Sequence, residues 1–248
     1  MLEAAFWGLV AASALVIGAE VAFAFKLNRM VIGLIMAFGI GTLISSIAFE
    51  LVEPSLELAD GWLVGLGLAV GALAFFFGDR AIAHVGGAGR KNPDRSDEDE
   101  GDGEGDSGMG IALGSALDGI PESAALGISL AAGGGVSVAL LAAIWISNFP
   151  ESLGSSVNMV KSGRPKRWVR GLWWSIVLVC TISAAVGYWV ISVSDGPTGA
   201  FVQAFAAGAL LTMIADEMAP EAFGKSALFT GLATTGGFIL AVFLTTLE

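Results

Sequence analysis

Charge is scarce in this sequence. Charged residues make up 14% of the 248 residues, whereas an ordinary soluble domain contains about 25%. Hydrophobic residues make up 55% of the chain. A chain with this balance has too few charged groups to cover the surface of a soluble domain. The composition therefore favours a protein that is surrounded mostly by lipid.

Cysteine and histidine are almost absent, with Cys180 and His84 as the single examples. One cysteine excludes a disulfide within the chain and argues against a thiolate metal cluster. The 12 Lys and Arg residues form no basic patch of the kind that binds nucleic acid, which argues against a nucleic-acid partner. The HExxH and GxSxG motifs of metalloproteases and serine hydrolases do not occur, so nothing in the sequence favours an enzyme.

Long apolar runs recur along the whole chain. Each is long enough to cross a hydrocarbon core of roughly 30 Å, and such a run must be helical because lipid cannot satisfy backbone polar groups. The sequence therefore predicts an all-α protein: a polytopic bundle of about eight transmembrane helices that forms one domain over 1–248 in the cell membrane. The predicted spans are 4–25, 30–53, 62–78, 109–132, 136–160, 171–193, 198–218 and 227–246.

The distribution of Lys and Arg gives the predicted bundle an orientation. All 12 lie in the connections that follow spans one, three, five and seven, which share one side if there are eight spans. The positive-inside rule makes that side cytoplasmic, so both termini are expected to be extracytoplasmic. The longest connection, 81–107, is acidic and rich in glycine. It is predicted to be a disordered cytoplasmic loop, and we favour a solvated tether over a cation-gathering or sensing segment.

Acidic side chains at membrane depth are the main functional signal. Ionisable groups there are costly and mark a site by default, and no Lys or Arg lies deep in a predicted span to pair with them. An acidic interior without basic partners indicates a path for cations. The acids in or at the ends of the spans are Glu20, Glu50, Glu53, Asp118, Glu122, Glu151, Asp216, Glu217 and Glu221.

Two consecutive spans share one polar frame. Residues 117–123 have the sequence Leu-Asp-Gly-Ile-Pro-Glu-Ser, and residues 146–152 have Ile-Ser-Asn-Phe-Pro-Glu-Ser. Asp118 and Glu122 are four residues apart and share a helix face, as do Ser147 and Glu151. Each proline removes a helical hydrogen bond and frees a carbonyl. Together with Asn148, these groups offer the oxygen ligands that hard divalent cations prefer.

Acids also precede a proline at the ends of two other spans. Glu50 and Glu53 end span two, and Asp216 and Glu217 end span seven. These two helices are predicted to run in opposite directions, so they could be counterparts in an inverted repeat. We expect the four acids to line the entry and exit of a cation path. The alternative is that they are interfacial acids at helix ends.

On these motifs the sequence resembles the ZIP family of metal transporters. In that family span four carries a motif like His-Asn-x-Pro-Glu-Gly, and span five a similar one. Residues 118–123 and 147–152 lie in register with these motifs, and 216–221 is similar to that family's Asp-Glu-x-x-Pro-Glu. The resemblance covers nearly the whole chain. It implies a carrier that brings a divalent metal into the cytoplasm, with Glu122 and Glu151 as metal ligands and Asn148 at a polar ligand position.

The chain also departs from the family pattern. Asp118 stands at the position of the span-four histidine, Gly119 at its neighbouring asparagine, and Ser147 at the span-five His or Gln. The family's Glu-Pro in span six is absent, which implies one metal site instead of two. Carboxylate and carbonyl ligands suit magnesium, calcium or manganese, while zinc also accepts carboxylates.

The sequence therefore predicts a membrane carrier for zinc, manganese, iron or a similar divalent cation, which is its substrate, with no bound cofactor. Asp118, Glu122 and Glu151 are expected to hold the ion, with Ser147 and Asn148 completing the shell. Membrane lipid is the expected surrounding partner, and a homodimer is left open. The alternatives are a non-transporting metal sensor or scaffold and, with less support, a metal-dependent membrane enzyme.

Overall fold

The computed structural model describes residues 1–25, 28–82, 107–133 and 135–247. Over these residues the chain is helical, without strands. The predicted loop 81–107 lies almost wholly outside the described residues, as does His84. The helices are α1 (Leu2–Ala24), α2 (Arg29–Ser46), α3 (Glu53–Leu58), α4 (Gly61–Ile82), α5 (Ser107–Gly133), α6 (Val138–Lys161), α7 (Lys166–Ser192), α8 (Gly196–Met213), α9 (Ala219–Ser226) and α10 (Thr230–Thr245).

The prediction of an all-helical chain is confirmed for the described residues, and each predicted span range overlaps one of the long helices. Five stretches are long and apolar enough, by length and composition, to cross a membrane. They are Leu2–Ala24, Arg29–Leu58, Gly61–Ala81, Lys166–Ser192 and Gly196–Thr245. The last one contains α8, α9 and α10. These stretches are compatible with a multi-pass membrane bundle.

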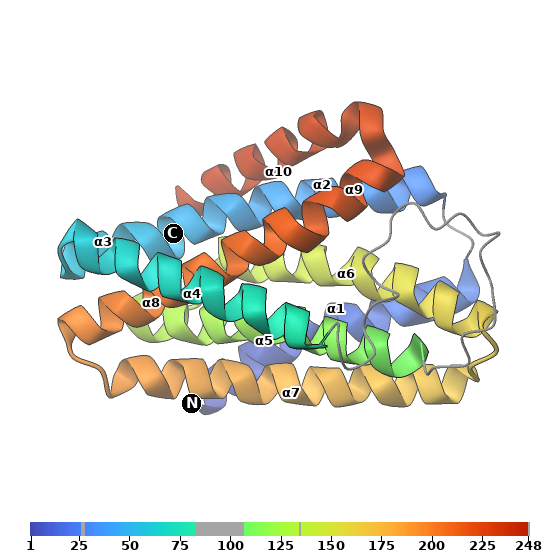
Figure 1. The fold of residues 1–248 in the computed structure, drawn as a ribbon, viewed down its shortest axis with the longest axis horizontal. Helices are drawn as coiled ribbons and strands as arrows, with labels where there is room; N and C mark the ends of the chain where they lie inside the picture. Colours follow the sequence, from blue (N-terminus) through green and yellow to red (C-terminus); the bar gives the residue numbers. More distant parts are fainter. Residues whose placement is uncertain (26–27, 83–106, 134, 248) are drawn as a thin grey trace.

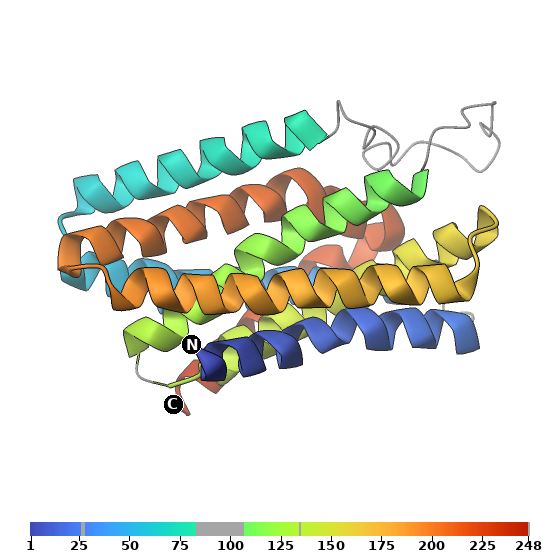
Figure 2. The same ribbon diagram turned by 90° about the horizontal axis from the view of Figure 1, so that it is seen from below.

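The helices lie side by side along the long axis of the molecule (Figure 1). Helices α1, α4, α6 and α9 end toward the right of that view, where α2, α5, α7 and α10 begin. The perpendicular view shows the same alternation, with α1 and α7 adjacent along one side of the bundle (Figure 2). This arrangement brings the connections after α1, α4, α6 and α9 to one end of the bundle.

Small residues allow the helices to approach closely. A Cβ added at Gly237 on α10 would overlap the backbone carbonyl of Phe38 on α2, and one at Gly41 on α2 would overlap the carbonyl of Thr234 on α10. A Cβ at Gly208 on α8 would likewise meet the backbone of α4. Close backbone approach at glycine is how membrane helices pack without a hydrophobic driving force. The pairs α2–α10 and α4–α8 are therefore fixed by glycine positions.

Helices α2 and α8 share an irregularity near their ends. A π-helical segment, Ile47–Val52, joins α2 to α3, and another, Ile214–Met218, joins α8 to α9. Each is followed by a proline at the start of the next helix, Pro54 or Pro220. The two helices run in opposite directions in Figure 1. Segments of this kind are often found at functional sites, and their matching positions agree with the predicted inverted relation between spans two and seven.

The buried core lies between α2, α5, α6 and α8. Large side chains on these helices, including Leu43, Leu126, Leu140 and Leu210, are almost fully buried and belong to one cluster. Apolar side chains on the outer faces of α4, α7 and α10 are exposed, as expected for surfaces that contact lipid. The residues of the candidate site lie on α2, α5, α6, the end of α8, the π-helical segment after it, and α9.

Candidate functional site

A small cavity of about 20 Å³ lies among the inner helices. A cavity needs roughly 10–15 Å³ to hold one water molecule, so this one has room for a single water or a bare metal ion. Five of its nine lining residues are acids, and none is Lys or Arg. The lining residues are Met36, Asp118, Glu122, Ser147, Glu151, Met213, Glu217, Met218 and Glu221.

The shared polar frame of α5 and α6 converges on this cavity. Asp118 and Glu122, one turn apart on α5, both line it and are almost fully buried. Ser147 and Glu151, one turn apart on α6, line it as well. Both prolines of the frame lie inside their helices. The helical spacing that predicted a common face thus places four of the five predicted ligands around one space.

A hydrogen bond connects the two helices at the cavity. The Ser147 hydroxyl lies 3.0 Å from Oε1 of Glu122, to which it can donate, and 3.0 Å from the carbonyl oxygen of Ile144. Asn148, the fifth predicted ligand, does not line the cavity, but it is 2% exposed and its side chain lies against the Glu122 carboxylate. Ser147 and Asn148 therefore surround one oxygen-rich group from α6.

Two buried acceptor atoms at this point lack a hydrogen-bond partner among the described residues. They are Oε2 of Glu122 and Oδ1 of Asn148. A buried polar atom without a partner costs on the order of 1–3 kcal/mol, and more if it is charged. Such atoms are accounted for by a bound cation, a proton or an ordered water. Their position beside the cavity makes it the strongest candidate site in the described part of the chain.

The predicted pathway residues occupy different places. Glu217 lines the cavity. Glu50 is partly buried and accepts a hydrogen bond of 3.4 Å from Ser129 on α5. Glu53 and Asp216 are exposed. The structure thus brings only one of these four acids, Glu217, to the cavity.

Three methionines and one acid at the cavity were missing from the predicted ligand set. Met36 comes from α2, Met213 and Met218 flank the π-helical turn after α8, and Glu221 lies on α9. Met213 stands four residues before Glu217, so helical spacing could have placed both on one face. Nothing in the sequence of α2 distinguishes Met36. Thioether ligands favour softer metals than carboxylates do.

Gly119 on α5 has a packing role. A Cβ at Gly119 would lie 2.7 Å from Sγ of Cys180 on α7. Cys180 is fully buried, and its thiol lies next to the Ser123 side chain of α5. The thiol therefore occupies space that a side chain at position 119 would need.

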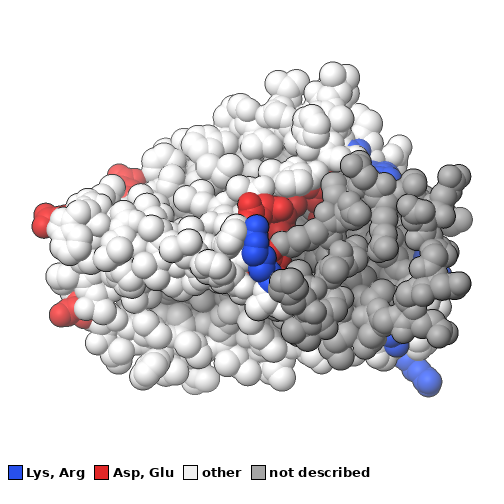
Figure 3. Space-filling model, in the orientation of Figure 1, with Lys and Arg blue, Asp and Glu red and all other residues white. Residues whose placement is uncertain are grey.

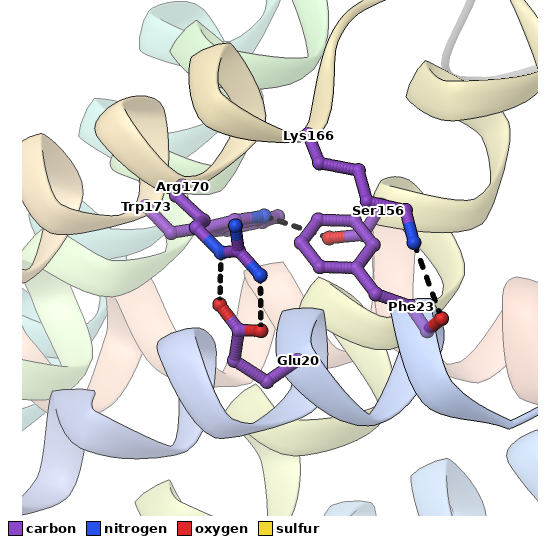
Figure 4. A network of polar contacts seen from close by, with 6 residues as sticks. All are labelled: Glu20, Phe23, Ser156, Lys166, Arg170 and Trp173. Carbon is purple, nitrogen blue, oxygen red and sulfur yellow. Dashed lines mark hydrogen bonds and ion pairs between the residues drawn. The ribbon is translucent and has the colours of Figure 1, made fainter.

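Glu20, which the sequence left without a basic partner, does have one. Its carboxylate forms two hydrogen bonds with Arg170 on α7, of 2.5 and 2.8 Å (Figure 4). Lys166 donates to the carbonyl oxygen of Phe23 nearby, and the Arg170 guanidinium lies 5.3 Å from the Phe23 ring centre. Arg170 precedes the predicted span six, yet it reaches back to α1. Glu20 therefore joins α1 to α7 and does not belong to the cavity.

Charged side chains on the face shown in Figure 3 lie in a few separate places. Figure 3 shows acidic side chains gathered in a hollow near the middle of the molecule, with a basic side chain beside them. Other acidic side chains lie at the left end and basic ones toward the right, and most of the remaining described surface is uncharged. Among the residues that the structure describes, no group of three or more His, Cys, Asp or Glu side chains is arranged to hold a metal ion.

No family model matches the chain, and no curated protein sequence matches it.

Proposed function

We propose that this chain is a multi-pass membrane carrier that brings a divalent metal cation into the cytoplasm through the cavity between α5 and α6. The proposal includes eight membrane spans, placement in the cell membrane, and both termini on the extracytoplasmic side. The chemistry it requires is binding and release of an ion, without a catalytic step.

The distribution of basic side chains supports the proposed orientation. The described basic residues lie toward the end of the bundle where α2 and α7 begin and α4, α6 and α9 end. In the positive-inside rule such an excess of Lys and Arg marks the cytoplasmic side. These residues are Arg29, Arg80, Lys161, Arg164, Lys166, Arg167, Arg170 and Lys225.

The observation that carries the proposed activity is the buried Glu122 carboxylate. One of its oxygens has no donor among the described residues, and the cavity beside it is lined by five acids without a basic side chain. Glu122 is only 3% exposed, and a carboxylate that is buried in this way needs compensation to keep its charge. A divalent cation would compensate it, and a cavity of about 20 Å³ has room for one such ion.

In this proposal Asp118, Glu122 and Glu151 supply the anionic ligands, with Ser147 and Asn148 completing the shell. The acids do not form a closed ligand set in the described conformation, so binding must draw their side chains together. The methionines at the cavity shift the expected preference from magnesium, calcium and manganese toward zinc or iron, because thioethers bind the harder ions poorly.

The test is uptake of zinc, manganese, iron, cobalt and magnesium into proteoliposomes that contain the purified full chain. Wild type should show saturable uptake of at least one ion, and the double variant Glu122→Gln with Glu151→Gln should lose it. Glu57→Gln on α3 is the matched control, because it removes an exposed carboxylate outside the cavity and outside the predicted path. Uptake that is unchanged in the double variant would refute the site. Binding without uptake of any ion would favour the non-transporting sensor.

A further inference from the structure

A lysine lies directly beside the acidic cavity. Nζ of Lys225, on α9, donates a hydrogen bond of 2.5 Å to Oε1 of Glu221 and lies 3.5 Å from Sδ of Met36 on α2. Glu221 and Met36 both line the cavity, whereas Lys225 does not. The ammonium group therefore contacts two residues of the cavity lining without lining the cavity itself. It lies at the end of the bundle that we assign to the cytoplasm.

The structure holds this lysine in place. Its side chain is 16% exposed, compared with 46% for its partner Glu221. A Cβ at Gly33 on α2 would lie 2.6 Å from Cβ of Lys225, and a Cβ at Gly154 on α6 would lie 3.4 Å from Nζ. Glycines on two neighbouring helices thus leave the room that the lysine stem and its ammonium group occupy. A side chain packed in this way is no freely moving surface charge.

A fixed ammonium group at this position opposes a metal ion in two ways. It compensates the charge of Glu221, which would otherwise be a further anionic ligand for the ion. It also repels the ion directly, and charge interactions at a partly buried site are several times stronger than in water. A permeation site must bind its ion strongly enough to admit it and weakly enough to release it. A cavity with five acids in its lining is at risk of holding its ion too long.

We propose that Lys225 is a resident counter-cation beside the cavity, which holds Glu221 and weakens metal binding so that the ion is released. This inference rests on the proposed function, since it assigns Lys225 a role in the release step of that transport. Lys225 would act partly through Glu221 and partly through its own charge.

The test compares Lys225→Met with wild type in two measurements, zinc uptake into proteoliposomes and equilibrium zinc binding to the purified full chain. Methionine keeps most of the stem and removes the charge. In Lys225→Met, we expect zinc to bind about ten-fold more tightly, because the variant no longer repels the ion with the lysine charge. The maximal uptake rate should fall about ten-fold, and KM should be lower. Lys225→Arg should restore both values toward wild type.

The matched control is Lys166→Met. It removes one positive charge from the same end of the bundle, but Lys166 contacts the Phe23 carbonyl and not the cavity. It should leave zinc affinity and KM unchanged. A purely structural role of Lys225 would lower the uptake rate at unchanged KM and affinity, and that result would overturn the inference.

The two proposals fail in different ways. Zinc uptake by wild type with unchanged binding and kinetics in Lys225→Met would overturn the role of Lys225 and leave the carrier intact. Tighter zinc binding in Lys225→Met without uptake by wild type would refute transport and still support the effect of Lys225 on the cavity. Wild type that neither binds nor takes up zinc or the other ions would refute both.

Discussion

Replacing Glu122 by glutamine is the sharpest test of the cavity as a metal site. Glutamine has nearly the same size, and its carbonyl oxygen can still accept the hydrogen bond from Ser147 that Oε1 of Glu122 accepts. The change removes one negative charge from a side chain that is 3% exposed. Without metal, we expect the stability to stay within about 1 kcal/mol of wild type, because burying a neutral amide costs less than burying a charge.

The expected loss of metal-dependent stability in Glu122→Gln follows from how much more weakly the variant binds the metal. Removing a residue that only orients a metal ligand typically weakens binding about 10–100-fold, so loss of a direct ligand should cost at least about 100-fold. At a metal concentration of 100 times Kd, wild type is stabilised by about 2.7 kcal/mol. At the same concentration, Glu122→Gln would be stabilised by only about 0.4 kcal/mol. For a chain of this size, the metal should therefore raise the Tm of Glu122→Gln by roughly 5–9 °C less than it raises the Tm of wild type.

The assay is thermal unfolding of the purified chain in nanodiscs, with and without metal, after the wild-type Kd has been measured. Glu53→Gln serves as the control and should keep the full metal-dependent shift, because Glu53 is exposed and does not line the cavity. A metal-dependent shift in Glu122→Gln as large as in wild type would refute Glu122 as a ligand.

Three further predictions concern the fold. Gly237→Ala should lower stability by about 1–3 kcal/mol, because the added Cβ would overlap the backbone of α2, whereas Gly231→Ala on the same helix has open space and should not; thermal unfolding compares them. A double-mutant cycle on Glu20 and Arg170 should give a coupling below about 1 kcal/mol, since both side chains are nearly half exposed; a larger value would mean that the pair is shielded from water. The hydrogen bonds from Thr198 lower the pKa of Asp195, the N-terminal cap of α8, below its usual 3.8. The ionised cap therefore stabilises the fold at neutral pH, and this stabilisation is lost as the pH falls below about 3.8. Asp195→Asn should flatten the acid limb of the pH–stability curve, and equal acid limbs in the variant and wild type would contradict this.

Helical spacing explains why part of the site was predictable. Asp118 with Glu122 and Ser147 with Glu151 are each one turn apart, and a helix places such pairs on one face whatever surrounds it. The convergence of the two faces also follows from the sequence to a degree, because the same polar frame on adjacent helices needs a common polar environment.

The rest of the cavity depends on helix packing. Met36 and Lys225 are 189 residues apart, and no local pattern connects them. Their contact exists because Gly33 lets α9 approach α2. Glu20 was assigned no partner because Arg170 lies outside the predicted span six. Only the tilt and packing of α7 against α1 bring the two side chains together.

The sequence by itself determined that the described chain is helical, where its long apolar helices lie, and which faces of α5 and α6 are polar. These properties depend on composition and on a period of 3.6 residues, both of which are local. The tertiary structure decided which acids share the cavity, that methionines join them, and that a lysine lies against its wall. Those relations arise where separate helices meet, and the residues on one helix do not encode the position of the next.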